Sequence, residues 1–467
     1  MSALTIETVR EHVIGIDTEV PILDGSTVRY VNLDNAATTP PLRPVLKTVN
    51  EFLRWYASVE RGAGFKSRVS TAAYAEARRI VGRFVGADPD AYTVVFIRNS
   101  TEAINKLAHR FPFSPGDIVL RSLMEHHSND LPWRLVADVD YIEVNAAGGL
   151  DLDHFEYLLN KYGERVKLVA ISGASNVTGY LNPIHAIAAR AHAAGAKILV
   201  DAAQLAPHRR IAMGDPDDPE HIDYLAFSAH KMYAPYGTGV LVGLNETFAR
   251  GTPDCVGGGT IELVTADQVR WAHLPEREEA GTPNAVGAIA LAAAIAALEE
   301  IGFAAIAAHE ARLTSRLLRR LERIDGVKVY GDRNPDRTEE RLGVVPFAVE
   351  GVPHQLVAAV LAFEGGIGVR NGCFCAHPYV LRLLGVSPAE IERYQAEVAR
   401  GSRVNLPGLV RASFGVYNDE SDVDALLEWV GRIARREYRG DYVQDEATGE
   451  FVPRGGPPGF ERYFSLR

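Results

Sequence analysis

The chain has 467 residues, 47% of them hydrophobic and 23% charged, a composition typical of a globular protein large enough for two domains. Its net charge of −11, from 49 basic and 60 acidic side chains, argues against a nucleic-acid partner. No apolar run approaches the ~20 residues of a membrane span, so no membrane partner is expected. The first residues mix charges early and lack the apolar core of a signal peptide, so we expect a cytoplasmic protein.

Only three cysteines are present, Cys255, Cys373 and Cys375. They are too few for a disulfide framework. Cys373-Phe374-Cys375 alone also provides too few ligands for a zinc site, so no metal site is predicted. A role for one of these cysteines as a reactive thiol stays open.

In chain order, residues 1–30 form an N-terminal arm in the predicted domain organisation, and an apolar run ends in a turn at Asp34 and Asn35. From about residue 71, helical and strand-like segments alternate. This alternation predicts an α/β fold with a largely parallel sheet covered on both faces. Seven strands are expected, at 93–97, 117–120, 139–144, 167–171, 197–200, 222–227 and 240–242.

The second half of the chain predicts a smaller domain. Residues 284–325 are alanine-rich and helical, and strands are expected at 342–349 and 366–370. The resulting boundaries are 31–300 for the large domain, 301–440 for a small α+β domain and 441–467 for a C-terminal tail. The tail, rich in Tyr, Asp, Gly and Pro, is expected to be poorly ordered.

Lys231 stands where the strand-like run 222–227 ends, between Ser228, His230 and a glycine-containing turn. A lysine at the mouth of a sheet, flanked by small residues, is well placed to form a Schiff base with an aromatic cofactor. The alternative is a solvated loop lysine, the usual fate of this residue. The rest of the chain favours the first interpretation.

Other polar residues follow the strands in the pattern that a pyridoxal phosphate site needs. Asp201 ends a buried strand and can pair with the pyridine nitrogen, although it could instead cap a turn. Ser100 or Thr101 is the expected N-cap of a helix, where backbone N–H groups favour phosphate. Further candidates are Gln204 near the ring oxygen, His126 stacked on the ring or merely on the surface, and Arg411 as a carboxylate anchor.

Several long motifs between about residues 30 and 420 resemble the class V aminotransferase superfamily, whose members are fold-type I pyridoxal 5′-phosphate enzymes. Within it the chain is most similar to the SUF-type (group II) cysteine desulfurases and selenocysteine lyases. The motifs are LDNAATTP, STEAIN, MEHHSNDLPW, SNVTGYLNP, VDAAQ, FSAHKMYAPYGTGVLVG, VGGGTI, EEAGTPNAVG, VRNGCFCAHP and VRASFGVYN.

The resemblance implies a role for each matching residue. Lys231 would be the Schiff-base lysine, Asp201 would lie on the pyridine nitrogen, and His126 would stack on the ring and serve as a catalytic residue. The resemblance also implies a homodimer with active sites at the interface. The remaining implied cofactor contacts are Thr101, Ser228 and His230 at the phosphate, Gln204 near the ring oxygen, Asn176 near the ring hydroxyl and the substrate, and Thr282 at the phosphate of the partner subunit. Ser100, at the same helix N-terminus as Thr101, is a further candidate for the phosphate.

In the resembling desulfurases an Arg-x-Gly-x-x-Cys loop carries the nucleophile, which here corresponds to Cys375. Its thiolate would take sulfur from L-cysteine, leave a persulfide and release L-alanine. Cys373 is better interpreted as a small apolar loop residue, although a relay role stays open. Arg370 and His377 would supply positive charge to the thiolate.

The chain departs from the family pattern at three places. Gly64 replaces a loop histidine, and Cys373 replaces another histidine. The segment 381–408 is long and helical, and it would alter the docking surface for a sulfur-acceptor protein.

The expected activity is therefore that of a cysteine desulfurase acting on L-cysteine. Arg411, Arg370 and Asn176 are the expected substrate-binding residues. The alternatives are a C–S lyase, selenocysteine lyase, aminotransferase or epimerase that does not use Cys375, or a sulfur-relay protein that keeps only the fold.

Overall fold

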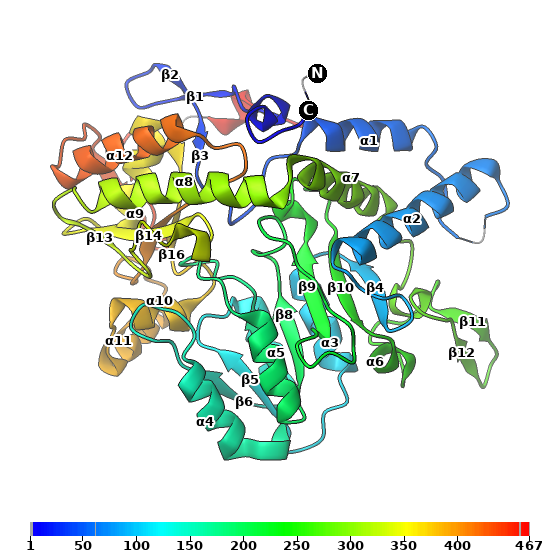
Figure 1. Cartoon of the computed structure of the whole chain (residues 1–467). Helices are drawn as coiled ribbons and strands as arrows, with labels where there is room; N and C mark the ends of the chain where they lie inside the picture. The colour runs from blue at the N-terminus through cyan, green and yellow to red at the C-terminus, as the bar shows by residue number, and fades with distance from the viewer. Residues whose placement is uncertain (1–2, 61, 457–458, 467) are drawn as a thin grey trace.

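The computed structural model describes residues 3–60, 62–456 and 459–466, and its centre is a seven-stranded sheet (Figure 1). In sheet order the strands are β4 (Tyr92–Ile97), β10 (Gly239–Leu244), β9 (Tyr224–Ser228), β8 (Lys197–Asp201), β7 (Val166–Ser172), β5 (Ile118–Ser122) and β6 (Asp138–Ile142). Only β10 runs antiparallel to its neighbours. The predicted α/β class with a mainly parallel sheet is confirmed, and all seven predicted strands are present.

Helices cover this sheet because its central strands are apolar on both faces. α3 packs against β9 and β10, α5 against β7 and β8, and α4 against β6, while α1 and α2 pack on α7. These helices and a short one after β10 span the following residues: α1 Arg43–Leu53, α2 Phe65–Phe84, α3 Ser100–Arg110, α4 Leu152–Tyr162, α5 Ile184–Ala193, α6 Asn245–Ala249 and α7 Ala285–Ile301.

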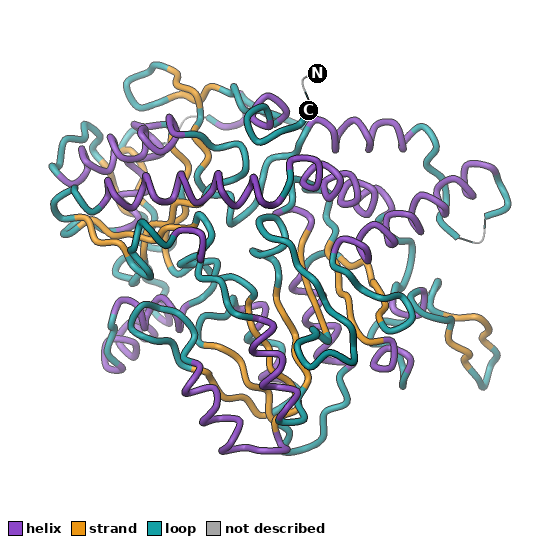
Figure 2. The backbone as a smooth tube through the Cα atoms, viewed as in Figure 1, coloured by secondary structure: helices purple, strands orange, loops and turns teal. Residues whose placement is uncertain are grey.

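The helical region predicted at 284–325 is two helices, α7 and α8 (Phe303–Leu321), which run across the upper part of the molecule in Figure 2. Gly302 separates them with φ of +88°, a conformation that glycine adopts without strain. No single described helix is long and apolar enough to cross a membrane. The pair α7 and α8 passes that test only together, with a bend of 74°, and most apolar side chains of both helices lie in the core.

A second hydrophobic core lies in the C-terminal part of the chain. It surrounds an antiparallel sheet in the order β13 (Val327–Val329), β14 (Val344–Val349), β17 (Leu409–Ser413) and β16 (Arg370–Gly372). Helices α8, α9 (His354–Gly365) and α12 (Glu420–Ala434) pack around it. Two further helices, α10 (His377–Leu384) and α11 (Pro388–Ala399), stand between β16 and β17.

The buried side chains of the N-terminal arm, Leu4, Val9 and Val13, belong to the first core, whereas Val31, directly after the arm, and Tyr442 of the tail pack in the second. β3 (Val31–Asn32) pairs in parallel with β15 (Ile367–Gly368), while β1 (Glu19–Pro21) and β2 (Thr27–Arg29) form a hairpin. The expectation that the tail is poorly ordered is wrong for its first part, because β18 (Tyr442–Gln444) and β19 (Phe451–Pro453) form a hairpin. The buried carboxylate of Glu364 holds it by accepting hydrogen bonds from the Arg439 N–H and the Tyr442 hydroxyl, both 3.0 Å.

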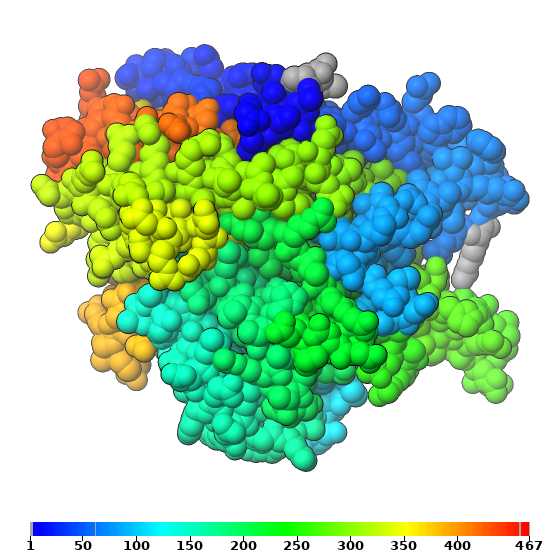
Figure 3. Space-filling model, viewed as in Figure 1, coloured from blue at the N-terminus to red at the C-terminus, as the bar shows by residue number. Residues whose placement is uncertain are grey.

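One hairpin projects from the body of the molecule, as Figure 3 shows. It consists of β11 (Ile261–Val264) and β12 (Val269–Trp271). Leu263, Val264 and Val269 are exposed on it, and Trp55 and Phe65 are exposed near the loop between α1 and α2. Both segments thus expose large apolar side chains, as surfaces that contact another protein do.

Candidate active site

A cavity of about 230 Å³ opens where three neighbouring strands of the large sheet end. Ser172, Asp201 and Ser228 are the last residues of β7, β8 and β9, and all three line it. Ligands bind at this edge of parallel sheets. All candidate residues from the sequence except Thr282 line the cavity: Ser100, Thr101, His126, Asn176, Asp201, Gln204, Ser228, His230, Lys231, Arg370, Cys375 and Arg411.

An amine and a carboxylate share this space. Lys231 ends the 3-10 turn η5 (Ala229–Lys231), directly after β9, and burial lowers the pKa of its amine to about 8, with the Asp201 charge opposing the shift. Asp201 is buried, and burial raises its pKa, although the N–H of Ala203 donates to it at 3.0 Å. A lysine that loses its proton near neutral pH is suited to bond covalently with an aldehyde.

Aromatic and amide groups border the same space. The Nδ1 atom of His126 accepts the backbone N–H of Ser128 at 3.1 Å, and burial lowers the pKa of its ring to about 3, so the ring is neutral. Gln204 donates its amide N–H to the carbonyl of Ala36 at 2.7 Å, and Asn176 donates to the carbonyl of Phe374 at 2.7 Å. These bonds fix the direction of both amides.

The amino end of α3 supplies hydroxyl groups and backbone N–H groups at one end of the cavity. The expected N-cap, Ser100 or Thr101, is wrong by one residue, because the Asn99 side chain accepts the Glu102 N–H at 2.9 Å and caps the helix. The Ser100 and Thr101 side chains are therefore free for other partners. Ser228 Oγ lies 3.0 Å from Ser100 Oγ. Hydroxyl groups around a helix N-terminus favour a bound anion.

Arg411 lies buried at the opposite side, in β17 of the second sheet. Its guanidinium donates to the carboxylate of Asp34 and to the carbonyl of Asn176, both at 2.9 Å, and stacks on the Phe374 ring with 4.9 Å to the centroid. Arg370 is more exposed and lies 3.8 Å from the same carboxylate. Two guanidinium groups at one cavity are suited to bind a carboxylate. Sequence reasoning missed Asp34 because its partner is 377 positions away.

The loop that carries Cys375 enters the cavity with an unusual backbone. Phe374 and Cys375 have φ values of +52° and +55°, and the Cys375 side chain is exposed. The backbone N–H of His127 donates to the Cys375 carbonyl at 2.7 Å, and the His127 ring stacks on that of His377 with centroids 4.7 Å apart. No role in this loop was predicted for His127 from the sequence. The one signal that could have indicated it is its position next to His126 in the sequence.

Cys373 faces away from Cys375. It is buried and does not line the active-site cavity; it borders a second, largely apolar cavity of about 610 Å³ next to α11. Its thiol donates to the Pro407 carbonyl at 3.2 Å, and burial raises its pKa to about 12. A thiol that stays protonated is a poor nucleophile, which agrees with its interpretation as an apolar loop residue.

Two other residues singled out from the sequence lie elsewhere. Thr282 is exposed, precedes α7 and does not line the cavity. Gly64 is the N-cap of α2 and also lies outside the cavity lining.

Together these groups fit pyridoxal 5′-phosphate. The lysine amine matches its aldehyde, the buried carboxylate matches a protonated ring nitrogen, and the helix N-terminus with its hydroxyl groups matches its phosphate.

The family model for class-V aminotransferases matches residues 31–426, which include every residue of the cavity. The chain belongs to this family. It is 36% identical over 433 residues to a probable cysteine desulfurase of Halalkalibacterium halodurans, covering 90% of this chain and 97% of that one. It is 33% identical over 414 residues to a cysteine desulfurase of Haloferax volcanii, covering 87% of this chain and 89% of the relative.

Solved structures give the same result for the fold. An apo cysteine desulfurase from Thermococcus onnurineus has a TM-score of 0.79 and 33% identity, covering 93% of this chain and 99% of its own. A cysteine desulfurase from Escherichia coli has a TM-score of 0.75 and 30% identity, covering 94% and 100%. The predicted fold-type I architecture is therefore confirmed, and both the family and the fold imply pyridoxal 5′-phosphate as cofactor.

Proposed function

We propose that this chain is a pyridoxal phosphate-dependent cysteine desulfurase, which converts L-cysteine to L-alanine and keeps the sulfur as a persulfide on Cys375. The observation that carries the proposal is that Lys231 and Cys375 line one cavity, together with Asp201 and Arg411. An amine for the cofactor and a thiol for the sulfur are the two groups that this reaction requires from a protein. The relatives named cysteine desulfurase support the same activity.

The cofactor would be held by groups at both ends of the cavity. Lys231 would bond its aldehyde carbon, Asp201 would pair with its ring nitrogen, and His126 would lie on the ring. The phosphate and the ring oxygens would be held by Ser100, Thr101, Ser228, His230, Asn176 and Gln204. When bound, pyridoxal phosphate withdraws electrons from the amino acid and so weakens the bonds at its Cα.

Lys231 is the proton carrier of the proposed reaction. With a pKa of about 8 its amine can take the proton from the substrate Cα and deliver one to a neighbouring atom near neutral pH. The neutral His126 ring beside it adds no positive charge to the site, since burial lowers its pKa.

Arg411 and Arg370 bind the substrate carboxylate, with the Asn176 side chain beside them. Arg411 is already oriented by Asp34 and by the Asn176 carbonyl, so little freedom is lost when the substrate enters. This contact holds the substrate sulfur toward the Cys375 loop.

Cys375 takes the sulfur in one displacement. Its thiolate attacks the sulfur of L-cysteine, an S–S bond forms, and the C–S bond breaks with its electron pair on the substrate Cβ. A proton then adds to Cβ, so that L-cysteine and one protein thiol yield L-alanine and one protein persulfide. Lys231 and Arg411 line the same cavity as Cys375, so positive charge would be available to the thiolate.

The working protein is a cytoplasmic homodimer in this proposal. The exposed apolar residues on the β11–β12 hairpin and beside α2 support an interface, and the exposed Thr282 would reach the phosphate of the partner subunit. A sulfur-acceptor protein would then collect the persulfide sulfur at the exposed Cys375.

Single-turnover mass spectrometry tests the proposal. The reduced holoenzyme receives L-cysteine, and we expect one added sulfur on the peptide that contains Cys375, with one equivalent of L-alanine. Cys375→Ser should lose both products and keep the cofactor's visible absorbance, whereas Cys373→Ser should form both. Pyruvate or a keto acid without persulfide, or undiminished turnover of Cys375→Ser, would instead establish a lyase, a transaminase or a selenocysteine-type enzyme. Absence of cofactor absorbance would refute pyridoxal phosphate dependence.

A further inference from the structure

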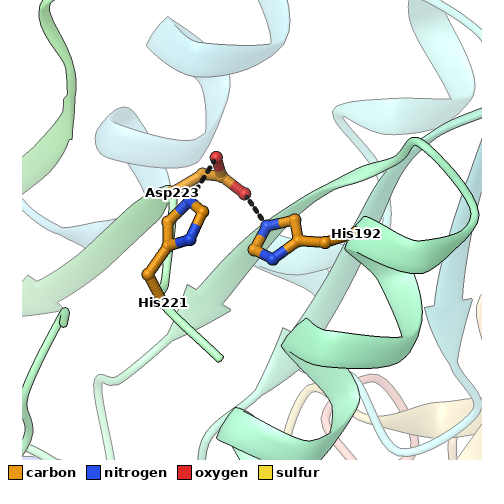
Figure 4. Close-up of side chains that lie close together, drawn as sticks. All are labelled: His192, His221 and Asp223. Carbon is orange, nitrogen blue, oxygen red and sulfur yellow. Dashed lines mark hydrogen bonds and ion pairs between the residues drawn. The ribbon is translucent and has the colours of Figure 1, made fainter. Parts of the chain in front are cut away.

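Two histidines and an aspartate meet at the edge of the large sheet opposite the active-site cavity (Figure 4). His192 lies in the last turn of α5, and His221 and Asp223 directly precede β9. One ligand atom from each side chain lies within 4.8 Å of the other two. We propose that His192, His221 and Asp223 bind a divalent transition-metal ion of the Zn²⁺ type.

The distances among these atoms suit such an ion. The Nε2 atoms of His192 and His221 lie 2.8 Å and 3.3 Å from the Asp223 carboxylate. Ligands of a tetrahedral zinc ion, with bonds of about 2.1 Å, lie about 3.4 Å apart. Small side-chain movements therefore convert the observed cluster into a three-ligand site with one open position.

Backbone carbonyl groups fix the orientation of both imidazole rings. The Nδ1 atom of His192 is 2.7 Å from the Pro219 carbonyl, and that of His221 is 2.6 Å from the Asp218 carbonyl. A carbonyl only accepts, so each Nδ1 carries the proton and donates it. In both residues Nε2 is the atom that faces Asp223; it donates to the carboxylate while the ring is protonated, and the bound ion would take the place of that proton. Backbone carbonyls behind ligating histidines are the usual outer support of metal sites.

The surroundings favour a cation at this point. The Asp223 side chain is fully buried and stays in place through the Ile198 N–H, which donates to it at 2.8 Å. The carboxyl end of α5 adds negative partial charge next to His192. The two imidazole rings are stacked at 4.2 Å, which is favourable for neutral rings bound to one ion, whereas two protonated rings would repel each other.

Lys197 is the one other cation beside this carboxylate among the described residues, at 3.1 Å. Its side chain is 36% exposed and also reaches Glu246 at 3.6 Å. Lys197 can thus turn toward Glu246 when the ion enters. His192 and His221 keep some exposure, so the ion has a path from solvent.

The position in the fold assigns the ion a structural role. It would join α5 to the segment before β9, at the start of the two strands, β8 and β9, whose other ends carry Asp201 and Ser228. The cofactor cavity lies at those other ends, so the site is separate from the proposed catalysis.

Zinc binding to the holoenzyme tests the proposal. The exposed thiols of Cys255 and Cys375 are first alkylated so that they do not bind the metal. Equilibrium dialysis against Zn²⁺, followed by metal analysis, then compares the wild type with His192→Gln and His221→Gln. The matched control is His185→Gln, which removes a histidine of the same helix whose Nδ1 also meets a carbonyl, that of Glu220 at 2.9 Å.

We expect about one Zn²⁺ per chain in the wild type and in His185→Gln, and at least a tenfold weaker binding in both cluster variants. Added Zn²⁺ should also raise the thermal unfolding midpoint of the first two proteins and leave that of folded cluster variants unchanged. Equal zinc binding by His192→Gln and His185→Gln, or no zinc on the wild type, would overturn the proposal and leave the cluster as a hydrogen-bonded triad. Cofactor absorbance in each variant reports that it has folded.

Discussion

Replacing Arg411 by lysine tests whether this side chain binds the substrate carboxylate. Arg411 donates from two nitrogens in fixed directions, to Asp34 and to the Asn176 carbonyl, and lies on the Phe374 ring. Lysine keeps the positive charge, so Asp34 is not left unpaired, but it loses the planar fork that holds a carboxylate through two bonds. The substitution therefore separates geometry from charge.

The magnitude follows from the bond that is lost. A hydrogen bond to a charged group contributes about 1.5–3 kcal/mol, and one decade of rate corresponds to about 1.36 kcal/mol. We expect kcat/KM for L-cysteine to fall about 10- to 150-fold in Arg411→Lys. Most of the change should be in KM, because the carboxylate is held equally before and during the reaction.

The assay is L-alanine formation over a range of L-cysteine concentrations, with cofactor absorbance recorded for every preparation. Arg370→Lys is the matched control, because its side chain is 55% exposed and its charge is screened by solvent. It should lose less than about fivefold. If Arg411→Lys stays within threefold of the wild type, or if Arg370→Lys is the more damaged variant, Arg411 is not the carboxylate anchor.

Three further outcomes are expected. Asp201→Asn should lower kcat roughly 100-fold or more at saturating cofactor, since the buried charge opposite the ring nitrogen is removed; an unchanged kcat would exclude that role. Glu279→Gln should lower the free energy of unfolding by about 3–5 kcal/mol in urea titrations, because it breaks the 2.6 Å pair with the mostly buried Arg78; a loss below 1 kcal/mol would contradict this. In the cofactor-free protein, the rate at which Lys231 captures added pyridoxal phosphate should rise with pH and reach half its maximum near pH 8, because only the deprotonated amine reacts; a midpoint near the ordinary lysine value of about 10.4 would contradict the lowered pKa.

Much of the fold could be predicted because local pattern and tertiary environment agree. The inner strands of the large sheet are short, mostly apolar runs that are buried on both faces, and they end where polar residues begin, as at Asp201 and Ser228. In a parallel sheet such ends meet at one edge. Candidate residues far apart in the chain could therefore be assigned to one cavity from the sequence.

Contacts between distant segments could not be predicted in the same way. The pair of Asp34 and Arg411 joins β17 to the turn after β3, and no periodicity of either segment reports it. The cluster of His192, His221 and Asp223 could not be predicted for the same reason, because only His221 and Asp223 lie close together in the sequence. The cap at Asn99 was misplaced by one residue because Asn, Ser and Thr cap helices about equally well.

The active-site loop shows why the direction of a side chain cannot be predicted without the tertiary structure. A residue with positive φ that is not glycine costs of order 1–3 kcal/mol, and Phe374 and Cys375 are two such residues in succession. The Asn176 amide holds the first carbonyl and the His127 N–H holds the second, both at 2.7 Å, so segments about 200 and 250 positions away impose this backbone. The turn directs Cys375 into the active-site cavity while Cys373, two residues earlier, borders the other cavity. The two thiols of one Cys-Phe-Cys motif thus have different surroundings: Cys375 lies in the cavity that Lys231 and Arg411 also line, and Cys373 is buried with a raised pKa.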